Sequence, residues 1–334
     1  MINKNLLTCS LATALTLGVM TQVNAATTIK IGHGANEQYH MHRALLHFEE
    51  LVEERSEGEI DVQIFPSSQM GPDREMIEGV QSGVLEMAVS PSSFFAGWDP
   101  AFAVVELPYV YPSKEVALDV LNGDTGKQML ERLEPLGLTG LGWMENGLRH
   151  ITNNVRAIET PEDLQGVKLR TMKVPAHVAT FETLGANPTP MNFGEVYSAL
   201  QQGVIDGQEN PIAIIDSQRF QEVQKYLSLT GHVFTVYIPV ISQHFMSSLP
   251  EEQQTLLRDA MQEAAAYQQE LVDAEEAGQL KKIGEAGVQI SDLTAEQRKG
   301  FAIQTEAVRS DYKEEVGAEI YDGWIQAIDD AAGN

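Results

Sequence analysis

Cysteine is nearly absent from this 334-residue chain, which contains one, Cys9. A single thiol cannot form an intramolecular disulfide, and thiolate metal sites need several cysteines. Cys9 also lies in an apolar N-terminal segment that we expect to be removed. The sequence therefore excludes disulfide frameworks, cysteine nucleophiles and thiolate metal centres from the mature protein.

Basic residues are also scarce, because 22 Lys and Arg stand against 48 Asp and Glu, which gives a net charge of −26. A negative field of this size repels polyanions. We therefore expect neither nucleic acid nor anionic lipid as a partner. An anionic ligand would need a locally positive pocket, so the search for a site narrows to a few arginines.

The sequence has no apolar run long enough to span a membrane. Its most apolar segment, residues 6–20, has about fifteen residues and contains Thr and Ser, whereas a transmembrane helix needs about 20. This segment follows Lys4 and precedes Val23-Asn24-Ala25, an arrangement typical of a cleaved export signal. We expect residues 1–25 to be removed, the mature chain to begin near Ala26, and no direct membrane insertion.

Common enzyme signatures are missing as well. The chain contains no Gly-x-Ser-x-Gly, no His-Glu-x-x-His, no Gly-x-x-x-x-Gly-Lys-Ser/Thr and no Gly-x-Gly-x-x-Gly, which argues against the corresponding hydrolases, metalloproteases and nucleotide-binding enzymes. Asp206 and Glu209 could form an acid–base pair. We interpret them instead as turn and capping residues of Asp-Gly-Gln-Glu-Asn-Pro.

Two histidines could be considered for a metal site. His40 and His42 lie two residues apart beside Glu37, a spacing that suits metal ligation from an extended segment but diverges on a helix. We interpret them as surface or pocket-rim residues, and we expect neither a metal nor a cofactor.

Strand and helix patterns alternate along the chain. The first half gives a strand at 28–32, a helix at 39–55, a strand at 59–65, a helix at 76–82 and a strand at 85–90. The second half repeats this order with a strand at 167–170, helices at 176–184 and 192–202, and a short strand at 204–207. Such alternation predicts mainly parallel sheets with helices on both faces. We therefore expect an α/β protein of two lobes, with core-covering helices at 250–284 and 294–315.

Arg170 is the most informative charged residue, because it lies in the apolar strand Val-Lys-Leu-Arg-Thr-Met. A buried guanidinium needs an anionic partner, and its planar fork matches a carboxylate in bidentate fashion. From the residues alone, that partner is either an internal carboxylate or the carboxylate of a ligand.

Several segments resemble the DctP-type family of solute-binding proteins of tripartite ATP-independent periplasmic (TRAP) transporters. They are Gly-Val-Lys-Leu-Arg170-Thr-Met, Leu-Gly-Ala-Asn-Pro-Thr-Pro190-Met, Phe193-Gly-Glu-Val-Tyr-Ser-Ala-Leu, Ile-Asp-Gly-Gln-Glu-Asn210-Pro, Phe-Pro-Ser-Ser-Gln69-Met-Gly-Pro-Asp-Arg-Glu75 and Glu-Leu-Pro-Tyr109-Val. Each segment alone is modest evidence for this family, but the order and spacing of the segments together are highly specific. The resemblance extends over essentially the whole chain.

The resemblance implies a two-lobed α/β clamshell with a long helix that spans both lobes. We expect residues 26–146 and 236–275 to form lobe I, and residues 147–235 and 276–334 to form lobe II. It also implies a periplasmic location, capture of a small organic acid, delivery to the membrane subunits of a TRAP permease, and no catalysed reaction. We expect a monomer.

The resemblance also implies roles for particular residues. Arg170 would clamp the ligand carboxylate, Arg149 would be a second pocket cation, Asn210 a hydrogen-bonding amide, and Phe193 a wall. The first lobe would add His33, Gln69, Glu75 and Ser92, from loops beyond the carboxyl ends of strands, where ligands of α/β proteins bind.

Departures from the family pattern bear on the ligand. Ser90-Pro-Ser-Ser-Phe94 lacks the charged side chains of the sialic-acid branch, and residues 171–177 differ from the segment of the malate-type branch. We therefore favour a sugar acid, such as a uronate or an aldonate, held by one clamped carboxylate and several hydroxyl contacts. The alternatives are a C4-dicarboxylate or another small carboxylate or sulfonate, a periplasmic enzyme acting on an organic acid, and a receptor for a signalling partner.

Overall fold

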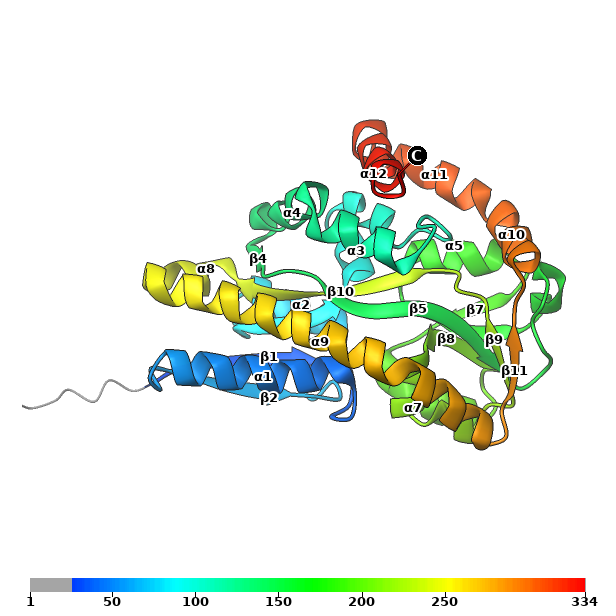
Figure 1. The fold of residues 1–334 in the computed structure, drawn as a ribbon, viewed down its shortest axis with the longest axis horizontal. Coiled ribbons are helices and arrows are strands. Elements are labelled where there is room, and N and C mark those ends of the chain that lie inside the picture. The colour runs from blue at the N-terminus through cyan, green and yellow to red at the C-terminus, as the bar shows by residue number, and fades with distance from the viewer. Residues whose placement is uncertain (1–25, 334) are drawn as a thin grey trace, which may run out of the picture.

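The computed structural model describes residues 26–333 (Figure 1). The expected export signal and its cleavage site lie outside these described residues. The strands are β1 (Thr27–His33), β2 (Ile60–Phe65), β3 (Met87–Pro91), β4 (Leu138–Gly140), β5 (Met144–Asn153), β6 (Lys168–Thr171), β7 (Asn187–Pro190), β8 (Gly207–Pro211), β9 (Tyr226–Leu229), β10 (Phe234–Ser242) and β11 (Gln289–Asp292).

Helices connect and cover these strands. The α-helices are α1 (His40–Arg55), α2 (Asp73–Gln81), α3 (Lys114–Asn122), α4 (Asp124–Glu131), α5 (Pro175–Thr183), α6 (Val196–Gln201), α7 (Ile212–Ser217), α8 (Gln243–Ser248), α9 (Glu251–Glu285), α10 (Ala295–Gln304), α11 (Glu306–Val316) and α12 (Ala318–Ala331). Three short 3₁₀ segments also matter for the site: η1 (Ser92–Gly97), η2 (Pro100–Glu106) and η5 (Phe193–Glu195).

The sheet order is β2-β1-β3-β10-β5-β8-β6-β7, with β4, β9 and β11 attached to this path. At one end, β1 pairs in parallel with β2 and β3, and at the other, β6 pairs in parallel with β7 and β8. The long strands β5 and β10 lie between these two units and run antiparallel to each other. Two parallel units joined by crossing strands confirm the expected two-lobed α/β fold.

The helices form where apolar side chains recur at helical spacing. In α1, Leu45, Phe48 and Val52 are fully buried and pack in one core cluster with residues of β1, α7 and α9. Burying such a side chain contributes about 1.5–3 kcal/mol each. This cluster reaches elements of both lobes and therefore ties them together on one side of the sheet.

Helix α9 confirms the expected lobe-spanning helix. Its 35 residues extend about 50 Å at 1.5 Å per residue, and it lies along α1 at one end and α7 at the other (Figure 1). Near its middle, Gln268 is fully buried and donates its Nε2 to the Glu145 carbonyl at 2.8 Å. This bond fixes α9 to β5, one of the strands that cross between the lobes.

The C-terminal helices return towards the first half of the chain. Helix α11 packs against η2 and α5, and α12 packs against α3 (Figure 1), where the buried Trp324 donates its Nε1 to the Tyr111 hydroxyl at 3.0 Å. The residue-level division into lobes remains a prediction. Across residues 26–333, no helix combines the length and the apolar character needed to cross a membrane.

One expected element is wrong. We expected a short strand at 204–207 and a polar turn after it, but the chain turns at 203–206 and the strand β8 begins at Gly207. The polar residues of β8 are all buried, because they hydrogen-bond and ion-pair with β5 and its surroundings instead of facing water. Hydropathy alone does not detect such a strand.

Candidate ligand-binding site

A small cavity lies between the two units of the sheet. It is lined by Gly34, Ala35, Asp73, Pro91, Phe94, Asn146, Arg149, Arg170, Met172, Phe193, Asn210, Ile214 and Tyr237, many of which lie at or just beyond strand ends, where ligands of α/β proteins bind. The structure thus brings together Arg170, Arg149, Asn210 and Phe193, as the sequence predicts. Its volume is about 30 Å³, room for one or two water molecules, so an organic acid can enter only if the lobes move apart.

Two larger hollows flank α9, with volumes of about 750 and 1020 Å³. The basic residues that line them, Lys127 and Arg258 in one and Arg219 and Lys282 in the other, are exposed to solvent. Exposed charges bind anions weakly, because water screens them. The smaller cavity is the better candidate, since its cations are buried.

Arg170 is a buried cation with an unused donor group. Its side chain extends from β6, is 2% exposed, and donates Nε and Nη2 to the Met191 carbonyl at 3.2 and 2.9 Å. Its Nη1 has no hydrogen-bond partner, and within residues 26–333 no carboxylate lies within 4.0 Å of the guanidinium. Burial lowers the pKa of Arg170 to about 10, so the group is still protonated at neutral pH. Glu209 and Asp73 act on this pKa in the opposite direction and raise it, so Arg170 has internal carboxylates in its surroundings but forms no ion pair with either of them.

The Phe193 ring forms one wall beside this cation. The Arg170 Cζ lies 5.8 Å from the ring centroid, within the range of a cation–π contact. Phe193 also packs against Phe220 in a T-shaped arrangement with the ring centroids 6.5 Å apart. The ring therefore both orients the guanidinium and limits the width of the cavity.

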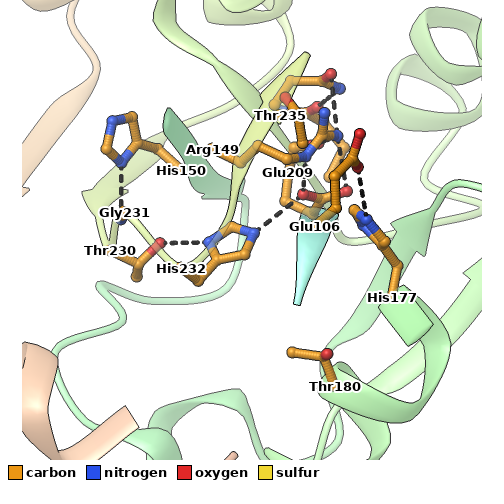
Figure 2. Close-up of polar contacts among 12 residues, drawn as sticks. Glu106, Arg149, His150, His177, Thr180, Glu209, Thr230, Gly231, His232 and Thr235 are labelled. Carbon is orange, nitrogen blue, oxygen red and sulfur yellow. Dashed lines mark hydrogen bonds and ion pairs between the residues drawn. The ribbon is translucent and has the colours of Figure 1, made fainter. Parts of the chain in front are cut away.

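Arg149, by contrast, is neutralised within the protein (Figure 2). It extends from β5 and forms a bidentate ion pair with Glu209 of β8, with Nε–Oε2 at 2.5 Å and Nη2–Oε1 at 2.9 Å. His232 lies 3.0 Å from the same carboxylate through Nε2 and 2.8 Å from the Thr230 hydroxyl through Nδ1. Burial alone would raise the pKa of Glu209, but Arg149 and His232 outweigh it and hold that pKa well below its usual range.

Glu209 therefore corrects our interpretation of the sequence. We expected a turn or capping residue, but its side chain is fully buried in β8 and is the counter-ion of Arg149. Asp206 does lie in a turn, where its carboxylate accepts from the Lys168 backbone N–H at 2.9 Å. The two carboxylates have separate partners and do not form an acid–base pair.

Two amides complete the polar wall of the cavity. Asn210 accepts from Arg149 Nη2 at 3.1 Å through its Oδ1 and donates its Nδ2 to Gln208 Oε1 at 2.6 Å. Asn146 accepts from the Tyr39 hydroxyl at 2.7 Å. These contacts fix the orientation of both amides, so each presents a defined group to the cavity.

Sequence reasoning missed Asp73. This residue begins α2, is 9% exposed and lines the same cavity as Arg170. Burial raises its pKa to about 6, against the opposing influence of Arg170. The sequence pointed to Glu75, two residues later in the same motif, but residues two apart on a helix face different directions, and Glu75 is exposed. The sequence feature that could have pointed to Asp73 is its position directly after Gly-Pro, in the first turn of a helix.

The other first-lobe predictions lie outside the cavity lining. Gln69 is exposed, and Ser92 is buried with its hydroxyl donated to Glu106 at 2.5 Å. His33 is buried with its Nε2 3.0 Å from His42 Nδ1, and burial lowers its pKa to about 3. Their contact with a ligand remains a prediction.

The two histidines interpreted as surface or rim residues are in fact buried: His40 is 2% and His42 is 7% exposed. They are enclosed because α1 begins at His40 and buries its first turn. In the part of the chain that the structure describes, no group of three His, Cys, Asp or Glu side chains is placed to hold a metal ion.

The chain is similar to known binding proteins over most of its length. The 2,3-diketo-L-gulonate-binding periplasmic protein YiaO of Escherichia coli is 37% identical over 278 residues, which cover 83% of this chain and 84% of that protein. The C4-dicarboxylate-binding periplasmic protein DctP of Rhodobacter capsulatus is 33% identical over 311 residues, or 92% and 93% of the two chains.

A crystal structure supports the same relationship. The sugar acid binding protein DctPAm of Advenella mimigardefordensis, in complex with galactonate, superposes with a TM-score of 0.89 at 32% identity, covering 92% of this chain and 99% of that one. Residues 31–316 match the model of bacterial extracellular solute-binding protein family 7, DctP. The two-lobed fold, the buried arginine and these matches agree, and the chain belongs to the DctP family of TRAP transporter solute-binding proteins.

Proposed function

We propose that this protein captures a sugar acid with a single carboxylate in the periplasm and passes it to a TRAP permease. The observation that carries this proposal is the unpartnered Nη1 of the buried Arg170. A guanidinium kept dry and without a counter-ion is costly for the folded protein. A ligand carboxylate supplies the missing acceptor and the missing charge.

The negative charge of Asp73 in the same cavity favours a ligand with one carboxylate over a ligand with two. Arg149 is already paired with Glu209, so Arg170 is the cation left for a ligand in this cavity. Asp73 lines the same cavity, and when ionised it repels a second carboxylate. The same carboxylate accepts hydrogen bonds from hydroxyl groups, and the Asn146 amide adds to this polar wall. A uronate or an aldonate matches this arrangement of one anion-binding and one hydroxyl-binding end.

The relatives give support of the same kind. The proteins similar to this chain include one that binds 2,3-diketo-L-gulonate and one in complex with galactonate, both sugar acids. A C4-dicarboxylate is the second candidate, because a further relative binds that class. The position of Asp73 favours the sugar acid.

The proposal includes location, partner and the absence of catalysis. The relatives named above as periplasmic proteins and the N-terminal sequence support an exported protein whose membrane partner is a TRAP permease. Catalysis would need an acid and a base across the cavity, and Glu209 is unsuited to that role because it is held in ion pairs. We propose a monomer that returns its ligand chemically unchanged.

A calorimetric titration of the chain from Ala26 onwards tests the proposal. The titrants are galactonate, galacturonate, 2,3-diketogulonate and succinate, and the bound acid is then recovered and compared with the starting material by mass spectrometry. Tight binding of a sugar acid, weaker binding of succinate and recovery of unchanged acid support the proposal. Preference for succinate would favour the dicarboxylate alternative, and a converted acid would establish an enzyme.

A further inference from the structure

We infer that Glu106 and His177 form a latch between the lobes, a pair of positioning residues that stabilises the closed form over a bound ligand. The inference rests on the proposed function in one respect, namely that the lobes open and close to admit an acid. Neither residue lines the cavity. Both act by setting how firmly its two walls are held together.

The two residues come from elements that follow strands of different lobes. Glu106 ends η2, which follows η1 and β3, whereas His177 lies in α5, directly after the strand β6 that carries Arg170. His177 Nε2 lies 3.2 Å from Glu106 Oε2 (Figure 2). The contact therefore joins the two lobes beside the cavity.

One carboxylate oxygen of Glu106 is fixed by hydrogen bonds within its own lobe. Its Oε1 accepts from the Ser92 hydroxyl at 2.5 Å and from the Ser93 backbone N–H at 3.3 Å, both in η1. These bonds leave Oε2 directed at the other lobe. When the lobes separate, Glu106 keeps its η1 partners and loses only His177.

Burial makes this contact matter for closure. The side chains of Glu106 and His177 are each 1% exposed, so each would be a buried group short of a partner if the other were removed. Among residues 26–333, His177 Nδ1 has no partner, so the Nε2 contact with Glu106 is the only hydrogen bond of the ring. Separation of the lobes would break this bond.

The position of His177 links the latch to the ligand. Helix α5 follows β6 after a short connection, so the element that brings Arg170 to the ligand also brings His177 to Glu106. A second bond between the lobes, from Asn36 Nδ2 to the Ser217 carbonyl at 2.6 Å, is only partly buried. Water competes for that bond, so we assign the larger part in closure to the buried pair.

Pulsed electron–electron distance measurements between two spin labels test the latch. The chain from Ala26 onwards contains no cysteine, so Val84→Cys and Val204→Cys provide unique labelling positions. Val84 is 78% and Val204 is 57% exposed, and they lie between α2 and β3 and between α6 and β8, one in each lobe. The distance distribution is recorded without ligand and across a galactonate titration.

His177→Phe and Glu106→Met should each raise the galactonate concentration at which half of the molecules are closed. The expected increase is about tenfold or more, because each substitution removes a hydrogen bond to a charged group. The losses of the two single variants should not add in the double variant, because either substitution alone already removes the His177–Glu106 hydrogen bond. Thermal unfolding checks that the variants fold; if Glu106→Met does not, His177→Phe alone decides.

If the distance distributions of His177→Phe superimpose on those of the parent protein, both with and without galactonate, the latch is overturned. Failure of galactonate to shorten the distance in the parent protein would count against the sugar-acid proposal instead. In that case the ligand-free distributions still decide the latch: longer distances in His177→Phe support it, and identical ones overturn it.

Discussion

Arg149 and Arg170 line the same cavity, yet among residues 26–333 only Arg149 forms an ion pair with a carboxylate. Glu209 neutralises Arg149 through two hydrogen bonds, while Arg170 donates only to a backbone carbonyl and keeps Nη1 unpaired. We therefore propose different tasks for the two arginines: Arg149 belongs to the folded framework between β5 and β8, and Arg170 is the group available to a ligand.

The Arg149–Glu209 pair should be essential for stability. Glu209→Gln leaves a fully buried guanidinium without its counter-ion, which we expect to lower the free energy of unfolding by about 3–5 kcal/mol. Urea denaturation measures this change. The matched control is Glu263→Gln, which breaks a bidentate pair with Arg55 at 2.7 Å on the surface and should have a small effect. Equal effects of the two substitutions would contradict the framework role of Glu209.

Asp73 should make stability depend on pH. Its pKa is about 6 in the folded protein against 3.8 for an unperturbed carboxyl, so ionisation penalises the folded state fully above pH 6 and not at all below about pH 4. At 1.36 kcal/mol per pKa unit, the penalty is about 3 kcal/mol. Asp73→Asn should therefore raise the melting temperature of the ligand-free protein at pH 7.5 and leave it unchanged at pH 4.

The exposed Asp329 on α12 provides a control for this measurement. Asp329→Asn should leave the melting temperature nearly unchanged at both pH values. A melting temperature of Asp73→Asn that equals the parent value at pH 7.5 would show that Asp73 carries no burial penalty.

Asp73 should also set the preference between acids. At pH 7.5 its carboxylate repels the second carboxylate of succinate and accepts hydroxyl groups of galactonate, so we expect the parent protein to bind galactonate more tightly. Asp73→Asn should weaken the binding of galactonate and strengthen the binding of succinate. The ratio of the two dissociation constants should therefore narrow by about tenfold, as expected for one charged contact of about 1.4 kcal/mol. Calorimetric titration with both acids gives this ratio. An unchanged ratio would remove Asp73 from the recognition of the ligand.

Much of the fold could be predicted because its signals are local. The alternation of apolar residues in β2 and the helical spacing of Leu45, Phe48 and Val52 in α1 are direct consequences of burial on one face. Strand β8 could not be recognised this way, because Glu209 and Asn210 are polar residues buried by pairing with distant parts of the chain.

Residues that line the cavity were predicted where the sequence contrast was strong; their contact with a ligand remains a prediction. Arg170 stands out as a charge in an apolar strand, and the resemblance to a known family added Arg149, Asn210 and Phe193. Asp73 and Glu75 could not be separated, because the choice depends on which way the first turn of α2 faces. Glu106 and His177 are 71 positions apart, and no sequence pattern joins them.

The central claim is that Arg170 binds the carboxylate of the ligand, and one paired measurement on Arg170→Met tests it most directly. Galactonate binding by calorimetry should fall by at least a hundredfold, since a charge-assisted contact in a buried site is lost. Thermal unfolding of the ligand-free variant checks that it folds, since the substitution also removes the two hydrogen bonds to the Met191 carbonyl. Near-native affinity for the acid in a folded Arg170→Met protein would contradict the account.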